Sequence, residues 1–326
     1  MKKRAPLQWI LAGIAGMAAA AAYGQTFPSP RAMNPNIGAN FLFQGQKTAS
    51  DPGDGFHVPE AEFSFKSDVD PYFTANMIFS VAETATGAYE ISPEEVYADT
   101  IAIPRITFRI GKFYSFFGKQ NRLHTHAYPF IDAPLISTAL FGEGFNPSGI
   151  QASALLPLDF FSELTVEGMQ NFRTLAHLRT LFDLGDFSTL ELGASGVTRW
   201  AYGVDATFKF RPTDRGQGRR INLAGEWMSG QLDGFTTLPG PDGLPTRGYV
   251  VYGQYEFAQQ TYGQYRFDNL ISNSQTRHGI LLGYAPTEFS VLRLQADRAF
   301  ATAGPVENRV IAQLNFTIGF HPAHDY

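Results

Sequence analysis

Two pairs of histidines are the residues whose type and spacing could bind a metal ion. His124 and His126 flank Thr125, and His321 and His324 lie near the C-terminus. Side chains at alternate positions of an extended segment point the same way, so the first pair could share one ion. Imidazole is a suitable ligand for zinc, copper and nickel, and we consider zinc the possible cofactor. The alternative is that these histidines form hydrogen bonds in a packed loop and in an exposed tail.

Carboxylates such as Asp132 or Glu143 could complete a metal shell at the first pair. Other catalytic patterns are missing: the chain has no Gly-x-Ser-x-Gly, no His-Glu-x-x-His and no phosphate-loop motif. It also has no cysteine, which excludes thiol catalysis, thiolate metal sites and iron–sulfur clusters. We therefore expect no enzyme. A barrel hydrolase built on Ser115 and His124 is the enzymatic alternative.

The N-terminus has the pattern of a secretory signal. Lys2, Lys3 and Arg4 precede an apolar run from Trp9 to about Ala22, and residues 22–24 read Ala-Tyr-Gly. This pattern predicts a signal peptide over residues 1–24 and a single domain over residues 25–326. The net charge of -5 argues against a nucleic-acid partner, because phosphate binding requires a basic face.

Apolar and polar residues alternate along most of the remaining chain, as the last strand shows best. Residues 310, 312, 314, 316, 318 and 320 are all apolar, whereas the positions between them are mostly polar. Period-2 alternation predicts β-strands with one apolar face. The candidate strands run about 9 to 13 residues, the length that a tilted membrane strand needs. Aromatic residues such as Trp200 and Tyr202 near strand ends are typical of interfacial girdles.

The sequence therefore predicts an all-β protein, a transmembrane antiparallel up-and-down β-barrel in the outer membrane. We expect about 16 strands, with 14 left open. They span residues 37–46, 58–69, 71–83, 93–103, 105–113, 148–157, 160–170, 175–184, 187–198, 200–211, 219–230, 246–257, 261–270, 276–285, 288–298 and 307–320. Short turns alternate with longer links, as bacterial barrels require.

Charged residues on the polar faces are expected to point into the lumen, because lipid would disfavour them. The pore-lining candidates on the strands and in the long loop are Arg105, Arg109, Lys119, Arg122, Glu163, Arg179, Asp205 and Arg293. A barrel of 16 strands leaves an aqueous channel, which favours passive diffusion of small solutes or ions. The alternative is a plugged structural or metal-binding barrel in which these charges neutralise one another.

The longest link, about Tyr114 to Pro147, is too apolar for a solvated surface loop. We expect it to fold back into the lumen and narrow it, with an external lid or a subunit contact as the alternative. The two histidine pairs then lie at opposite membrane faces, so they form no joint site.

Two stretches carry a resemblance to a known group. FRIGKFYSFFGKQNRLHTHAYPFIDAP and the earlier FHVPEAEFSFKSDVDPYFTANMIFSV resemble porin-like outer-membrane proteins related to the phosphate-selective porins. The chain is similar also to the porin-like family labelled as zinc-regulated outer-membrane proteins, through its His-x-His-Ala-x-Pro-Phe run. The resemblance implies a barrel with a role in solute or metal uptake, and no catalytic residue. The loop offers only Lys119 and nearby Arg122, which argues against phosphate selectivity.

The expected partners are outer-membrane lipid, small solutes or ions, the barrel-assembly machinery and further copies of the chain in a homo-oligomer. Assembly machinery reads a terminal aromatic residue, and here Tyr326 follows Phe320 and a His-Pro-Ala-His insertion.

Overall fold

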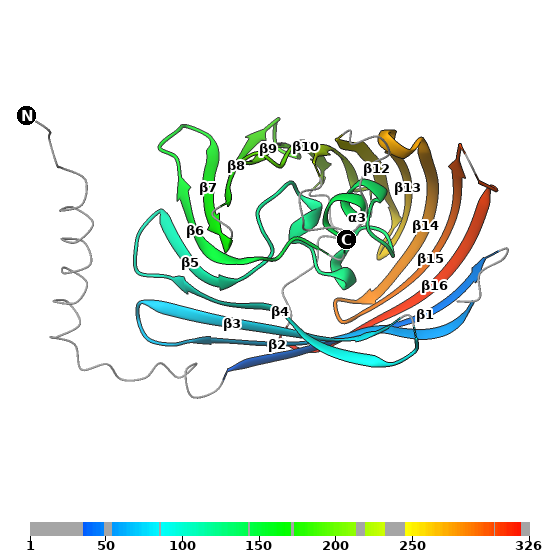
Figure 1. Ribbon diagram of the computed structural model, residues 1–326, viewed down its shortest axis with the longest axis horizontal. Helices are drawn as coiled ribbons and strands as arrows, with labels where there is room; N and C mark the ends of the chain where they lie inside the picture. The colour runs from blue at the N-terminus through cyan, green and yellow to red at the C-terminus, as the bar shows by residue number, and fades with distance from the viewer. Residues whose placement is uncertain are drawn as a thin grey trace, which may run out of the picture.

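A computed structural model of the chain describes residues 35–48, 54–84, 86–142, 144–170, 173–212, 219–231, 245–302 and 304–320. The described residues form sixteen antiparallel strands that close into one barrel. Each strand pairs with its sequence neighbours, and β1 closes the ring on β16 (Figure 1). The predicted fold class is therefore confirmed, with 16 strands rather than 14. The expected signal peptide lies outside the described residues.

The strands agree closely with the predicted ranges. Their bounds are β1 (Asn36–Thr48), β2 (Gly55–Asp68), β3 (Phe73–Glu83), β4 (Tyr89–Thr100), β5 (Ile106–Lys112), β6 (Ser148–Leu155), β7 (Phe161–Met169), β8 (Arg173–Asp183), β9 (Ser188–Val197), β10 (Ala201–Phe210), β11 (Ile221–Gly230), β12 (Thr246–Ala258), β13 (Thr261–Leu270), β14 (Gln275–Thr287), β15 (Ser290–Ala301) and β16 (Glu307–Gly319). Among the described residues, no helix has the length and apolar composition needed to span a membrane.

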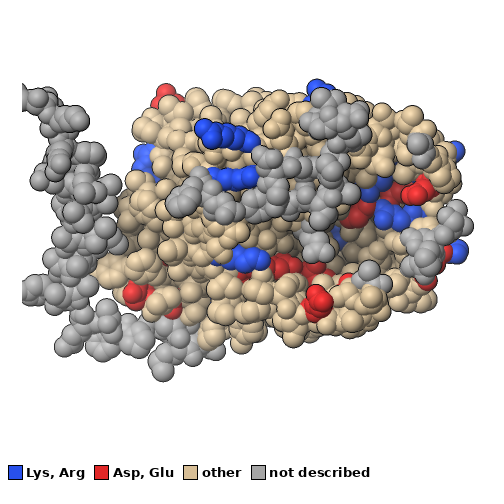
Figure 2. All heavy atoms as spheres, viewed as in Figure 1, with Lys and Arg blue, Asp and Glu red and all other residues tan. Residues whose placement is uncertain are grey.

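The alternation in sequence becomes an apolar outer wall and a polar inner wall. On β16, Val310 and Ile318 are 48% and 62% exposed on the outside, whereas Gln313 and Asn315 point inward and are buried. The outer residues are exposed because they face outward, where membrane lipid would surround the barrel. The inner residues are buried because other parts of the chain fill the lumen. Figure 2 shows tan atoms over much of the surface, and many of the charged side chains in view lie within the hollow of the barrel.

The seam between the first and last strands is held on its inner face by a polar contact. Phe41 of β1 pairs with Phe316 of β16 in register. Next to this pair, the Asn40 side-chain amide donates to Asn315 and to Thr317 at 2.6 and 2.9 Å. The backbone pairing of β1 with β16 leaves the barrel without an open edge, and these side-chain hydrogen bonds reinforce the seam.

The link between β5 and β6, residues 113–147, folds back inside the ring of strands (Figure 1). We call it the inserted loop. It contains the short helical turns η1 (Gln120–Arg122) and η2 (Thr125–Ala127) and the helix α3 (Leu135–Phe141). Helix α3 lies against β12 and β13. The predicted insertion of this loop into the lumen is confirmed.

Candidate functional site: the inserted loop and its anchors

Apolar side chains of the inserted loop form a small core against the inner wall. Phe117, Ile136 and Leu140 are fully buried. The Phe141 and Phe145 rings lie 5.8 and 4.8 Å from the Trp200 ring, centroid to centroid. This core explains why the sequence of the loop is so apolar.

The prediction for Trp200 is wrong. It was expected on the outer face beside Tyr202, but it precedes the first residue of β10 and is only 5% exposed, inside the barrel. Arg199, in the turn before it, has a left-handed φ of 58°. The turn breaks the alternation, so Trp200 turns inward while Tyr202, within the strand, keeps its outward place at 59% exposure.

Backbone amides at the start of the loop are capped by carboxylates and a hydroxyl of the wall. Glu226 of β11 accepts from the N–H groups of Lys119 and Gln120 at 3.1 and 3.3 Å. Glu167 of β7 accepts from Phe116 at 2.8 Å. A buried amide without a partner costs roughly 1–3 kcal/mol, so these acceptors are needed wherever the loop leaves regular structure.

Gly118 is required between these capped amides. Its φ is +62°, and a Cβ built there would lie 1.6 Å from Glu226 Oε1. Its N–H donates to Ser195 Oγ of β9 at 2.8 Å. Only glycine combines this conformation with such a close carboxylate.

A cluster of arginines and aspartates on the wall holds the far side of the loop at Asp132. The Asp132 carboxylate accepts from Arg266 of β13 at 2.8 Å, from Arg309 of β16 at 2.6 Å and from Arg277 of β14. Burial alone would raise the pKa of Asp132, but these arginines hold it well below its usual range. We call this group, with the wall residues Asp268 and Asp297, the Asp132 cluster.

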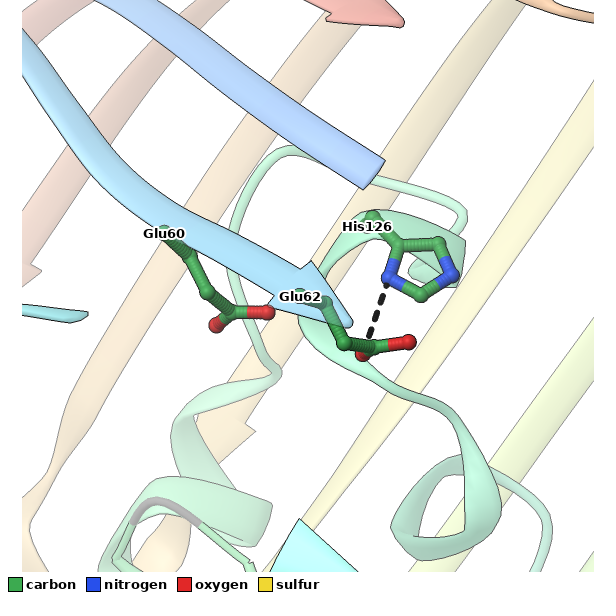
Figure 3. A group of neighbouring side chains, drawn as sticks. All are labelled: Glu60, Glu62 and His126. Carbon is green, nitrogen blue, oxygen red and sulfur yellow. Dashed lines mark ion pairs between the residues drawn. The ribbon is translucent and has the colours of Figure 1, made fainter. Parts of the chain in front are cut away.

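A different group of charges, the His–Glu cluster, holds the loop against β2 and β4. It consists of Glu60, Glu62, Glu94, Glu95, His124 and His126. Figure 3 shows Glu60 and Glu62 extending from β2 toward His126 of the loop. Ligand atoms of Glu60, Glu62 and His126 all lie within 4.8 Å of one another, as do those of Glu62, Glu94 and His124.

Carboxylates surround His124. Its Nδ1 lies 2.7 Å from Glu94 Oε2 and 3.0 Å from Glu62 Oε2, and its Nε2 lies 3.3 Å from Glu95 Oε2. Burial alone would lower the pKa of His124, but the neighbouring carboxylates raise it well above its usual value. The paired placement of His124 and His126 that the sequence suggested is present: their rings lie 5.8 Å apart, stacked.

Sequence reasoning proposed different acids as partners of these histidines. Asp132 is occupied by arginines, and Glu143 lies outside the described residues. Glu94 and Glu95 were not identified as inward-facing. A β-bulge explains this, because the register against β3 shifts so that Ile78 pairs with Glu95 and Phe79 with Pro93. Two adjacent glutamates thereby contact one histidine, which strict alternation forbids. The tail pair, His321 and His324, also lies outside the described residues.

Seven of the eight pore-lining candidates divide into three groups. Lys119, Arg122, Glu163 and Arg179 lie on the side of β7–β9 and stay partly exposed. Arg109 is paired with Asp99 at 2.7 Å, and Asp205 is nearly buried. Arg105 is exposed in the turn between β4 and β5.

Arg293 points inward, but it binds the inserted loop. It is 2% exposed and donates to the carbonyl of Tyr128 at 2.7 Å and to Gln313. It therefore holds the inserted loop. Sequence reasoning also missed Glu191 as a partner of the loop: its carboxylate accepts from Lys119 Nζ at 3.1 Å. The position of Glu191 on the polar face of β9 was the sequence feature that could have indicated this contact.

Known structures share this architecture. The chain superposes on the loop L8 deletion mutant of OmpT, an outer membrane protein of Vibrio cholerae, with a TM-score of 0.60 and 11% identity, covering 87% of this chain and 99% of that one. The outer membrane channel DcaP of Acinetobacter baumannii gives 0.57 and 11%, covering 90% and 99%. The fold is that of the outer-membrane porins. An anion-selective porin from Comamonas acidovorans agrees, with a TM-score of 0.58 and 10% identity over 87% and 99% of the two chains.

Sequence comparison adds less. No family model matches the chain. An uncharacterized protein of Aquifex aeolicus (strain VF5) is 28% identical over 340 aligned positions, covering 83% of this chain and 70% of that protein. The predicted porin-like barrel and its outer-membrane location are thus confirmed through the fold. The likeness to phosphate-selective or zinc-regulated members stays a prediction.

Proposed function

We propose that the protein is an outer-membrane channel for the passive diffusion of small solutes or ions, narrowed by the inserted loop. The observation that carries this proposal is that charged side chains beside the inserted loop stay partly exposed inside the barrel. On the side of β12–β16 the loop buries Arg266, Asp268 and Gln295, which are at most 1% exposed, but the Arg309 side chain stays 25% exposed. On the side of β7–β9, the side chains of Lys119 and Glu191 remain 22% and 20% exposed.

The side of β7–β9 carries charges of both signs. Arg179 and Glu163 face each other across β8 and β7 at 3.5 Å, with side chains 26% and 18% exposed. The guanidinium of Arg122 in the loop lies 4.7 Å from the centre of the Phe116 ring, and that ring packs against His177 of β8, on the same side of the lumen. Mixed charges along a narrow aqueous path slow solutes by size and distinguish them by charge. Small hydrophilic solutes and ions are therefore the class of substrate that this passage fits.

The same burial supports a second candidate, a plugged barrel without channel activity. Wall residues on both sides of the lumen contact the loop, from Glu62 to Asn315. A flux measurement separates the two. Liposomes containing the protein should admit small sugars or amino acids faster than protein-free liposomes, with rates that fall steeply as solute size rises. Influx equal to that of empty liposomes at every solute size supports the plug and rejects the channel.

A hydrolase built on Ser115 and His124 has little support. Ser115 is fully buried, and both ring nitrogens of His124 face carboxylates rather than a hydroxyl. A general base has to reach the hydroxyl that it deprotonates. The arrangement favours a structural or ligand-binding role for His124, and we propose no enzymatic activity.

Oligomerisation and assembly belong to the same proposal. OmpT of Vibrio cholerae is known in a trimer form. We propose that this barrel also forms a homo-oligomer and is inserted by the barrel-assembly machinery into outer-membrane lipid. Cross-linking in native membranes, followed by mass determination, tests the oligomer.

A further inference from the structure

We propose that the His–Glu cluster binds one divalent transition-metal ion of the zinc class, and that this ion ties the inserted loop to β2 and β4. Metal binding itself stands apart from the channel function. The proposed effect on the pore rests on that function.

The donor atoms already converge. Glu62 Oε2 lies 3.0 Å from His124 Nδ1 and 3.3 Å from His126 Nδ1, so both imidazoles aim at one carboxylate oxygen. Ligand atoms held roughly 2.0–2.2 Å from a tetrahedral ion are about 3.3–3.6 Å apart. His124 and His126 each form a compact group of ligand atoms with Glu62, but their own nitrogens lie more than 4.8 Å apart. Binding of one ion by both imidazoles therefore requires the two rings to move toward each other, with Glu62 as the shared ligand. Two imidazoles with carboxylates suit zinc and its first-row neighbours better than calcium or magnesium.

The charges of the cluster point to a missing cation. Within the described residues, the ion pairs of Glu62, Glu94 and Glu95 run only to His124 and His126. Glu62, Glu94 and Glu95 therefore face two histidines, which leaves negative charge in excess even with both rings protonated. Uncompensated charge is costly to bury.

The Asp132 cluster, at the opposite anchor, shows how the same wall balances its charges without an ion. Arg266, Arg277 and Arg309 there match Asp132, Asp268 and Asp297 in number. No such balance exists at the His–Glu cluster, although both clusters hold the same loop. A divalent cation would supply the balance.

The surroundings meet the other requirements of a metal site. The Glu94 and His124 side chains keep 13% and 14% exposure, which leaves an entry path, whereas that of His126 is 4% exposed. The cluster is also braced from outside. Asn146 donates to the Glu94 carbonyl at 2.9 Å, and the Tyr114 N–H donates to Glu95 Oε1 at 2.9 Å. Such outer hydrogen bonds orient ligands and raise affinity.

Calorimetry with Zn²⁺ alone tests binding, using the full protein extracted in detergent and stripped with EDTA. The wild type should bind one Zn²⁺ per chain at the cluster, and His124→Ala/His126→Ala should weaken this binding at least about tenfold. Glu62→Gln preserves the size of the side chain and covers the case in which the histidine variant does not fold; it should also weaken binding about tenfold. No binding by the wild type, or unchanged affinity in either folded variant, overturns the proposal.

Two control variants locate the ion. His278→Ala removes an outward-facing histidine that contacts Tyr265 at 2.7 Å, and His321→Ala/His324→Ala removes the tail pair. Both should bind Zn²⁺ as the wild type does. Loss of the single Zn²⁺ site in either control would place the ion elsewhere and overturn the assignment.

Conductance shows whether the ion acts on the pore. Zn²⁺ should reduce conductance fluctuations of the wild type and leave Glu62→Gln unaffected. Zn²⁺ binding without any conductance would reject the channel and keep the metal site. Conductance without Zn²⁺ binding would reject the metal site and keep the channel.

Discussion

The carboxylate of Asp132, on the inserted loop, lies 2.8 Å from the guanidinium of Arg266, which is 1% exposed on the inner face of β13. The Arg266 guanidinium also donates to the Asp132 backbone carbonyl at 2.8 Å. Arg266 therefore binds Asp132 through both the side chain and the backbone of this loop residue. This contact fixes the loop against the wall opposite the His–Glu cluster.

Asp132→Asn tests this anchor. The change leaves three arginines of the wall without their shared partner, and breaking a buried ion pair costs about 3–5 kcal/mol. We expect the free energy of unfolding in denaturant to fall by about 3 kcal/mol, toward the lower limit because the Asp132 side chain is 23% exposed. Asp159→Asn, in the exposed turn between β6 and β7, is the matched control and should change it by less than about 0.5 kcal/mol. Equal effects of the two variants would contradict the claim that Asp132 anchors the loop.

The difference in unfolding free energy between the wild type and Asp132→Asn should depend on pH, because the folded protein lowers the pKa of Asp132. In the unfolded chain an aspartate titrates near about 3.9. A carboxyl whose folded pKa lies lower contributes stability that is present above the unfolded pKa and is lost as pH falls through the folded pKa. The gap between wild type and Asp132→Asn should stay constant from neutral pH to about pH 5 and shrink below about pH 4. Denaturant titrations across this range measure it, and a gap that closes already between pH 7 and 5 would refute the assignment.

Gly118 and Gly87 form a matched pair for the carboxylate cap of Glu226. Both have a left-handed φ, +62° and +77°, but a Cβ at Gly87 meets nothing within 4 Å. Gly87→Ala should cost about 1–2 kcal/mol from backbone strain alone. Gly118→Ala should cost about 1–3 kcal/mol more, because it also drives the loop away from Glu226. Thermal unfolding in detergent compares them, and similar losses would show that Glu226 does not hold the loop.

Ion selectivity should respond to the charges beside β7–β9. Arg179→Gln removes a positive charge from the partly exposed passage, so the reversal potential in a KCl gradient should shift toward cation preference. Glu163→Gln should shift it toward anions. Arg298→Gln, on the exposed outer rim of β15, is the control and should shift neither way. If Arg298→Gln matches Arg179→Gln, the passage does not run where we place it.

The barrel could be predicted from the sequence because membrane strands repeat one simple constraint. Each lipid-facing position must be apolar and each lumen-facing position can be polar, so the strand from Glu307 to Gly319 shows its two faces without any tertiary information. The insertion of the loop was predictable for a related reason, since residues such as Ile136 and Leu140 require burial.

The site was harder to predict because it depends on breaks in that pattern. The β-bulge at Glu94 brings both Glu94 and Glu95 toward His124, and the turn at Arg199 brings Trp200 inside. Partners of the loop are also remote in sequence: Asp132 meets Arg309 across 177 positions. The alternation of residue types shows which face of a strand a side chain lies on. It does not show which loop residue contacts that strand, or at which position along it.

Planar-bilayer recording tests the central claim most directly, comparing the wild type with the loop-releasing variant Asp132→Asn. Our account predicts discrete conductance steps for the wild type and larger or noisier steps for the variant, because the loop narrows an open passage without closing it. A silent wild type at every voltage, beside a variant that conducts, would show that the loop is a plug and would contradict the account.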